Sequence, residues 1–249
     1  MSSTKAIFKK QLKGSVKNPE TLIQFMIYPV MALVMGVMTN IDFEGYYLPQ
    51  EMIDAMMANM PNLATMMATM FAGMALIPTV AGIIAEDIEK KSLRFLVMAG
   101  VKPSAYLIGV GSVIFFVSAL TTVAFGFIAG FGGMDFLIFS ASMLAGVAAS
   151  IVLGATIGIL TKNQQAATAL SMPIALVLGF GPMAAQFNDT AARVLHIFYT
   201  QQLNVVADNL NHPYLATTPI WQSFVIMGAN ILVVGVLFVV VFRRKGMGD

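Results

Sequence analysis

Long apolar runs dominate this sequence of 249 residues and limit what it can fold into. A helix needs roughly 20 mostly apolar residues to cross a bilayer, because no water there can satisfy its backbone. The runs that meet this requirement are residues 22–38, 64–85, 106–131, 136–160, 166–185 and 219–242. Only 10% of all residues are charged, against about 25% in a soluble domain. The sequence therefore predicts an all-α membrane protein in which six transmembrane helices form one domain over residues 1–249.

The basic residues gather on one side of this predicted topology. Of the 14 Lys and Arg residues, only Arg193 falls in a loop on the opposite side. Loops that retain Lys and Arg are cytoplasmic. We therefore expect a multi-pass protein of the plasma membrane with both termini in the cytoplasm. The net charge of +2 reflects this asymmetry and gives no reason to expect a nucleic-acid partner.

The residues ahead of the first run have a modest amphipathic pattern. Phe8 and Leu12 share an apolar stripe, with Lys9 and Lys13 beside it. A helix of this kind can lie in the membrane interface while its lysines reach toward the headgroups. A disordered basic tail is the alternative, since short helices are marginal in water. We expect an interfacial helix within residues 1–20, followed by the six-span bundle over residues 22–242.

The segment between the second and third runs is the richest in charge. It contains three acidic and then four basic residues, namely Glu86, Asp87, Glu89, Lys90, Lys91, Arg94 and Lys102. Acids ahead of bases complement the dipole of a helix that starts near Glu86, and Gly100 with Pro103 would end it. A solvated loop would explain the lysines but not the apolar positions such as Leu93. The pattern predicts a short cytoplasmic helix that docks onto a soluble subunit.

Small residues recur at every fourth position of the fourth run, at Ser142, Gly146, Ser150, Gly154 and Gly158. This spacing puts them on one helix face, where a neighbouring backbone can approach closely. Such a face serves packing within one chain or an interface between two subunits. We favour packing within the chain.

The second outer loop, residues 186–218, contains too many apolar residues for a freely solvated loop. The loop contains Asn188-Asp189-Thr190, a predicted N-cap ahead of a helix over residues 191–210. We expect this segment to pack on the bundle or to dip into the outer leaflet, where its backbone must stay helical.

The side-chain inventory argues against catalysis and metal binding by this chain. The sequence has no Cys, and its two histidines, His196 and His212, have no neighbouring carboxylates at metal-ligand spacing. Met66, Met70 and Met74 share a helix face and could ligate Cu(I), but flexible packing is the better explanation, since neither Cys nor His joins them. The sequence also has no G-x-x-x-x-G-K-[ST] loop for ATP. We expect no catalytic residue, no metal site and no cofactor on the chain itself.

Three stretches resemble the ABC-2 type permeases, the membrane subunits of one class of ATP-binding-cassette transporters. They are Asn18-Pro19-Glu20, the run IAEDIEKKSLR at residues 84–94, and the run KPSAYLIG at residues 102–109. The resemblance implies an interfacial helix at residues 5–17, a coupling helix within residues 86–99 and partly re-entrant helices within residues 186–218. It also implies two permease subunits and two ATPase subunits, with ATP and Mg²⁺ bound by the ATPases.

These observations together predict a non-enzymatic transport subunit driven by separate ATPases. The residues expected to contact an ATPase are Glu86, Asp87, Glu89, Lys91, Ser92, Leu93 and Arg94. Spans without charged residues favour a hydrophobic, lipid-like, drug-like or peptide cargo over an ion, and the resemblance favours export. The alternative is a carrier, channel or membrane scaffold that works without an ATPase.

Overall fold

The computed structural model describes residues 19–38, 62–92, 95, 98, 100, 103–213 and 218–245. Within these residues the elements are helical and no strand occurs. In chain order they are α2 (Pro19–Met38), α4 (Leu63–Met70), η1 (Phe71–Ala75), α5 (Leu76–Glu89), α7 (Pro103–Ile128), α8 (Gly133–Leu160), α9 (Gln164–Phe187), α10 (Asp189–Leu195), α11 (Tyr199–Asn211) and α12 (Ile220–Lys245). The predicted interfacial residues Phe8, Lys9, Leu12 and Lys13 lie outside the described residues.

The all-helical class is confirmed for the described residues, and the last five apolar runs form helices long and apolar enough to cross a membrane. These spans are Leu63–Glu89, Ala105–Ile128, Gly133–Leu160, Gln164–Phe187 and Ile220–Arg244. The first run is also helical, as α2, but its described apolar stretch, Leu22–Met35, is shorter than these. The six-span layout therefore stays a prediction.

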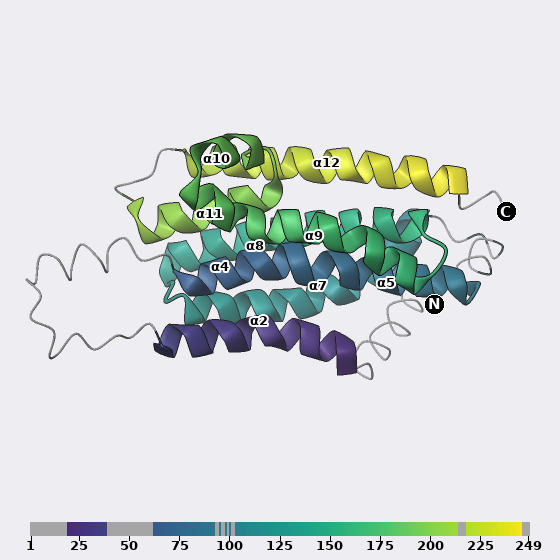
Figure 1. Cartoon of the computed structure of the whole chain (residues 1–249), viewed down its shortest axis with the longest axis horizontal. Helices are drawn as coiled ribbons and strands as arrows, with labels where there is room; N and C mark the ends of the chain where they lie inside the picture. Colours follow the sequence, from purple (N-terminus) through teal and green to yellow (C-terminus); the bar gives the residue numbers. More distant parts are fainter. Residues whose placement is uncertain are drawn as a thin grey trace, which may run out of the picture.

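Successive long helices run in alternating directions, so their ends gather at two ends of the bundle (Figure 1). We call the end where α5, α8 and α12 finish the inner end, and the end where α10 and α11 lie the outer end. Lys90, Lys91, Lys162, Arg243 and Arg244 are at the inner end. Arg193, on α10, is at the outer end. The structure thus collects these basic residues as the sequence pattern predicted.

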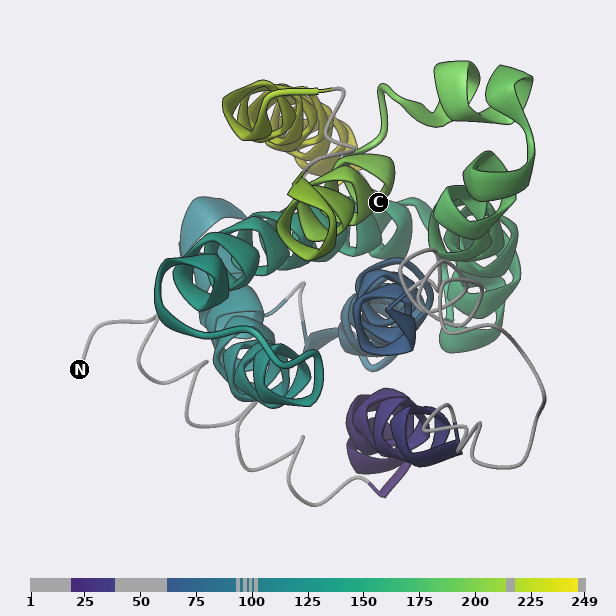
Figure 2. The ribbon, with the colours of Figure 1, turned by 90° about the vertical axis from the view of Figure 1, so that its left-hand side faces the viewer.

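The second span, made of α4, η1 and α5, lies at the centre of the bundle (Figure 2). In its most apolar window, 78% of the residues are buried, against 11% of the residues in that of α12. It contacts α2, α7, α8, α9 and α11, whereas α12 packs against α8 and α11. The second span is therefore the element through which the others are held together.

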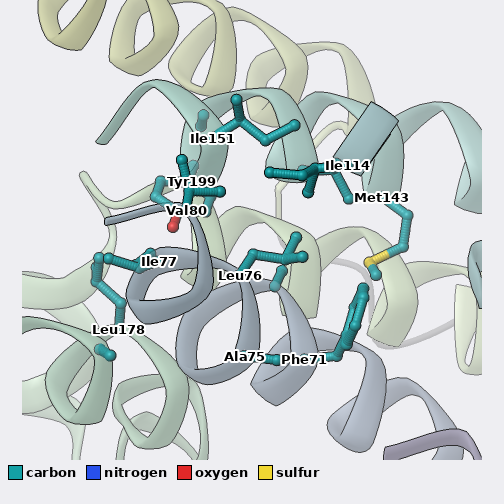
Figure 3. Close-up of a cluster of buried hydrophobic side chains, with 14 of the residues drawn as sticks. Phe71, Ala75, Leu76, Ile77, Val80, Ile114, Met143, Ile151, Leu178 and Tyr199 are labelled. Atoms are coloured by element: carbon teal, nitrogen blue, oxygen red, sulfur yellow. The ribbon is translucent and has the colours of Figure 1, made fainter. Parts of the chain in front are cut away.

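The middle of the second span is a single π-helical turn, η1. The N–H of Leu76 donates to the carbonyl of Phe71, five residues back. Pro78, which has no N–H to offer, follows within the first turn of α5. The Phe71 ring is fully buried, with ring centroids 5.5 Å from Phe25 and 5.9 Å from Phe125. Figure 3 shows Phe71 beside the core side chains of α5, α7 and α8.

Glycines allow the central span to touch its neighbours at the level of the backbone. A Cβ on Gly154 of α8 would lie 2.7 Å from the Ile77 carbonyl oxygen, and one on Gly158 would lie 2.8 Å from that of Ala81. A Cβ on Gly73 would lie 2.7 Å from the backbone nitrogen of Gly179 in α9. Approach this close gives dispersion contacts between backbones, which stabilise helix pairs where lipid offers no hydrophobic driving force.

Replacement of Gly154 by Ala tests this packing. The added carbon also meets Val80 Cβ at 2.8 Å, so α5 and α8 must separate. We expect a loss of about 1–3 kcal/mol in the free energy of unfolding, although Ala is the better helix former. Thermal unfolding of the purified protein in one detergent measures it. The control is Gly228→Ala in α12, whose added carbon has no atom within 4 Å. Equal stability of the two variants would show that the contact is not tight.

Candidate functional site

The charged segment at the inner end is divided between two helical stretches. Helix α5 ends at Glu89, where the N–H of Lys90 donates to the Glu86 carbonyl and that of Lys91 donates to the Ile88 carbonyl, each at 2.9 Å. Lys91 then has a φ of 59°, the left-handed conformation that terminates helices. Helix α5 therefore ends one turn after Glu86 and does not continue through Lys91, and a coupling helix within residues 86–99 stays a prediction.

A new turn begins after this break. The N–H of Phe95 donates to the Lys91 carbonyl at 3.3 Å. Phe95 and Met98 are described and project outward, with 66% and 67% of their surface exposed. Ser92 is half-buried, whereas Leu93 and Arg94 lie outside the described residues.

The three acidic residues at the end of α5 have different surroundings. Glu86 is on the exposed side and pairs with Lys90 one turn later. The hydrogen bond from Lys90 to that carboxylate, followed by its charge, raises the pKa of Lys90 above its ordinary value. Exposed pairs of this kind contribute little to stability. Glu86 therefore remains accessible to a partner.

Asp87 is turned inward. Its Oδ2 accepts a hydrogen bond from the hydroxyl of Tyr106 in α7 at 3.0 Å, and both side chains are buried. This bond joins the end of the second span to the beginning of the third. In this structure Asp87 thus supports the inner end from within, and its carboxylate is not displayed to a partner.

Glu89 joins α5 to α9. Its Oε2 accepts a hydrogen bond from the backbone N–H of Gln164 at 3.2 Å. The neighbouring Asn163 Oδ1 accepts from the N–H of Ala166 at 2.8 Å. The first N–H groups of a helix have no partner within the helix, and a carboxylate there also complements the dipole. The inner end of the second span is thereby attached to the start of α9.

The small-residue ladder of α8 faces elements of the same chain. Gly154 and Gly158 lie against α5, as described above, and a Cβ on Gly146 would lie 2.6 Å from Leu203 Cδ1 in α11. The hydroxyl of Ser142 donates to the Phe139 carbonyl at 2.8 Å, within α8. Ser150, in contrast, makes contacts outside its own helix.

Ser150 joins three elements, a connection that the spacing pattern alone did not reveal. Its hydroxyl lies 2.7 Å from the carbonyl oxygen of Ala72 in η1 and 2.9 Å from the hydroxyl of Tyr199 in α11. Both side chains are buried. Burial raises the pKa of Tyr199 well above its ordinary value, so the phenol stays protonated and can donate. Four polar residues in the first turns of a buried helix, Thr200, Gln201, Gln202 and Asn204, were the signal available in the sequence.

The outer segment is two helices rather than the single one predicted over residues 191–210. Within the predicted cap Asn188-Asp189-Thr190, Asn188 is the residue that caps α10, and its side chain accepts from the N–H groups of Thr190 and Ala191 at 2.9 and 3.1 Å. The chain then turns before α11 begins at Tyr199. Nδ2 of Asn230, within α12, donates to the carbonyl of Ile197 in this turn at 2.8 Å. Asn230 lies ten residues into α12, or about 15 Å along its axis. The turn therefore reaches well down the bundle from its outer end.

A half-buried carboxylate lies on α11. Nδ2 of Asn204 donates to Oδ2 of Asp208 at 2.8 Å. Burial raises the pKa of Asp208 to about 6, with a smaller opposing effect from His212. In the part of the chain that the structure describes, no group of three or more His, Cys, Asp or Glu residues is arranged to hold a metal ion.

One protein-family model, described as ABC-2 family transporter protein, matches residues 37–240. The match includes α4 through α11 and most of α12. No curated protein gives a significant match to the chain.

Asp208 predicts a pH dependence of stability. Its folded-state pKa of about 6 is above the ordinary value of 3.8, so protonation favours the folded state. The contribution of the protonated Asp208 to the free energy of unfolding is complete below about pH 4 and is lost as pH rises through about 6. We expect the thermal midpoint of the purified protein to fall over that interval. Asp208→Asn should remove this part of the change. If the pH profiles of the two proteins coincide, the carboxyl does not titrate as described.

Proposed function

The chain belongs to the ABC-2 family of transporter proteins, and we propose that it is the permease subunit of an exporter that separate ATPase subunits drive. The observation that carries the proposal is the surface at the inner end of the second span. We call it the inner surface, made of Glu86, Lys90, Lys91, Phe95 and Met98. It presents two exposed apolar side chains beside charges of both signs. Apolar anchors surrounded by charged groups are typical of protein docking sites.

The inner surface is attached to the centre of the bundle. Asp87 and Glu89, behind it, bind Tyr106 and the start of α9. A force applied at Phe95 or Met98 would therefore act on the second, third and fifth predicted spans together. This attachment supports a role in transmitting movement from an ATPase to the membrane helices, for which the expected residues are Glu86, Glu89, Lys91, Ser92, Leu93 and Arg94. Asp87 would contribute by positioning rather than by contact.

The distribution of charge supports the orientation. The basic residues that follow α5, that lie between α8 and α9, and that end α12 share the inner end. The rule that cytoplasmic segments retain Lys and Arg favours assigning this end to the cytoplasm. We propose a protein of the plasma membrane with both termini in the cytoplasm. The segment of α10 and α11 would then enter the bundle from the opposite side as a partly re-entrant element.

Nucleotide chemistry would belong to the partner. The sequence has no phosphate-binding loop, so ATP and Mg²⁺ would be held by two ATPase subunits, and this chain would perform no catalysis itself. A second permease subunit would complete the assembly. The spans offer hydroxyl and amide groups on apolar surroundings, which suits a hydrophobic, lipid-like, drug-like or peptide cargo.

Replacement of Phe95 and Met98 by Ser tests the docking role. Loss of two exposed apolar anchors should reduce recovery of an ATPase subunit with the permease at least about tenfold, since anchors of this kind contribute about 1–2 kcal/mol or more. Affinity purification from native membranes followed by ATPase assay measures this.

The control is Phe187→Ser at the outer end of α9, where the side chain is 80% exposed. This variant should retain the wild-type amount of ATPase. Equal recovery with all three proteins would place the docking surface elsewhere. Absence of any ATPase from the wild-type preparation, together with cargo movement by the chain alone, would favour an ATPase-independent carrier.

A further inference from the structure

The hydroxyl of Ser150 connects the π-helical turn of the second span to α11. A serine has one hydrogen to donate, and the Ala72 carbonyl at 2.7 Å and the Gly146 carbonyl at 2.9 Å can only accept. The Tyr199 hydroxyl at 2.9 Å must then be the donor to Ser150 while Ser150 donates to a carbonyl. The Ala72 carbonyl is the nearer of the two acceptors, so we take the arrangement to run from Tyr199 through Ser150 to the backbone of η1, with the Gly146 carbonyl as a second acceptor within α8.

The turn η1 is the place where the second span can change length. A π-helical turn contains one residue more than an α-helical turn. Passing this residue along the helix would displace α5 relative to α4 by about 1.5 Å and rotate it by about 100°. Helix α5 contains Glu86 and leads directly into the rest of the inner surface, so a push there can be absorbed at η1. The Ala72 carbonyl is one of the groups whose position would change.

Helix α11 is held so that it would respond. Tyr199 is its first residue, is 2% exposed, and belongs to the buried core cluster (Figure 3). Its other end is attached at the outer end, where Asn62 Nδ2 donates to Asn211 Oδ1 at 3.3 Å and to the Ala129 carbonyl at 3.2 Å. Movement of the Tyr199 end would consequently tilt α11 about its outer attachment.

We infer that Ser150 and Tyr199 are positioning residues that link η1 to α11, so that displacement of α5 at the inner end changes the position of α11 in the outer half of the bundle. The inference rests on the proposed function, since it supplies the route by which an ATPase at the inner surface would reach the outer side. It assigns this transmission to one contact, which we call the joint. The joint is the three-part contact of the Ala72 carbonyl, Ser150 and Tyr199.

Hydrogen exchange in the isolated permease tests the joint without any partner. Tyr199→Phe and Ser150→Ala should each speed amide exchange in both η1 and α11 by roughly fivefold, which corresponds to about 1 kcal/mol. The effect of Tyr199→Phe on η1 is the informative one, because Tyr199 reaches η1 through Ser150. The control is Ser142→Ala, which removes a fully buried serine hydroxyl from the same helix but one bonded only within α8. It should leave exchange in η1 and α11 unchanged.

The complex purified with its ATPase tests the transmission. Addition of ATP should change exchange at the end of α5 and in α11 of the wild-type and Ser142→Ala proteins. In Ser150→Ala and Tyr199→Phe the change at the end of α5 should persist while that in α11 falls at least threefold. An α11 response that persists in all variants would overturn the inference. A missing ATP response at α5 of every protein would overturn the proposed function instead, and the isolated permease would still decide whether the joint exists.

Discussion

Backbone contact between α5 and α8 is the interaction on which the remaining structure depends. Gly154 and Gly158 add no side chain of their own to the contact, so the backbone of α8 lies against the Ile77 and Ala81 carbonyls of the second span. Burying the second span in this way brings its polar ends into reach of other helices, so Asp87 meets Tyr106 and Glu89 meets the start of α9. The Asp87 carboxylate is buried away from water, so its bond with Tyr106 satisfies a group that would otherwise be costly to bury, whereas the bond of Glu89 is exposed and serves to attach α9. The inner surface consists of neighbouring residues that these two bonds leave available to a partner.

The apolar runs were sufficient to predict the helical class and the five spans, because length and composition decide what can cross a membrane. The helix start at residues 188–190 was also recognisable, since a capping side chain, here that of Asn188, acts on neighbours in sequence. The break at Lys91 was not predictable, because the apolar and charged pattern continues across it and only the backbone conformation changes. The same holds for the inward turn of Asp87, which depends on where Tyr106 lies in space.

The ladder of α8 shows the limit of a spacing argument. Spacing of four predicts one face but cannot distinguish a residue that only makes room from one that also bonds. Gly154 only allows α5 to approach, and Ser142 bonds within α8. Ser150, in contrast, contacts η1 and α11. This contact explains why the first turns of α11 are polar although they are buried. A helix that enters the bundle from its outer end must bury its first turn, and Tyr199 and Gln202 do so by bonding to Ser150 and to the His196 carbonyl.

The most direct measurement is a photo-crosslink from the inner surface. The photoreactive amino acid benzoylphenylalanine replaces Phe95 in the full-length protein, irradiation is performed in native membranes, and the product is identified by mass spectrometry. We predict a crosslink to a subunit that contains a G-x-x-x-x-G-K-[ST] loop, and none from the same substitution at Phe187. Crosslinks from position 95 only to lipid or to this chain, with the membranes active in transport, would contradict the assignment of this surface to an ATPase.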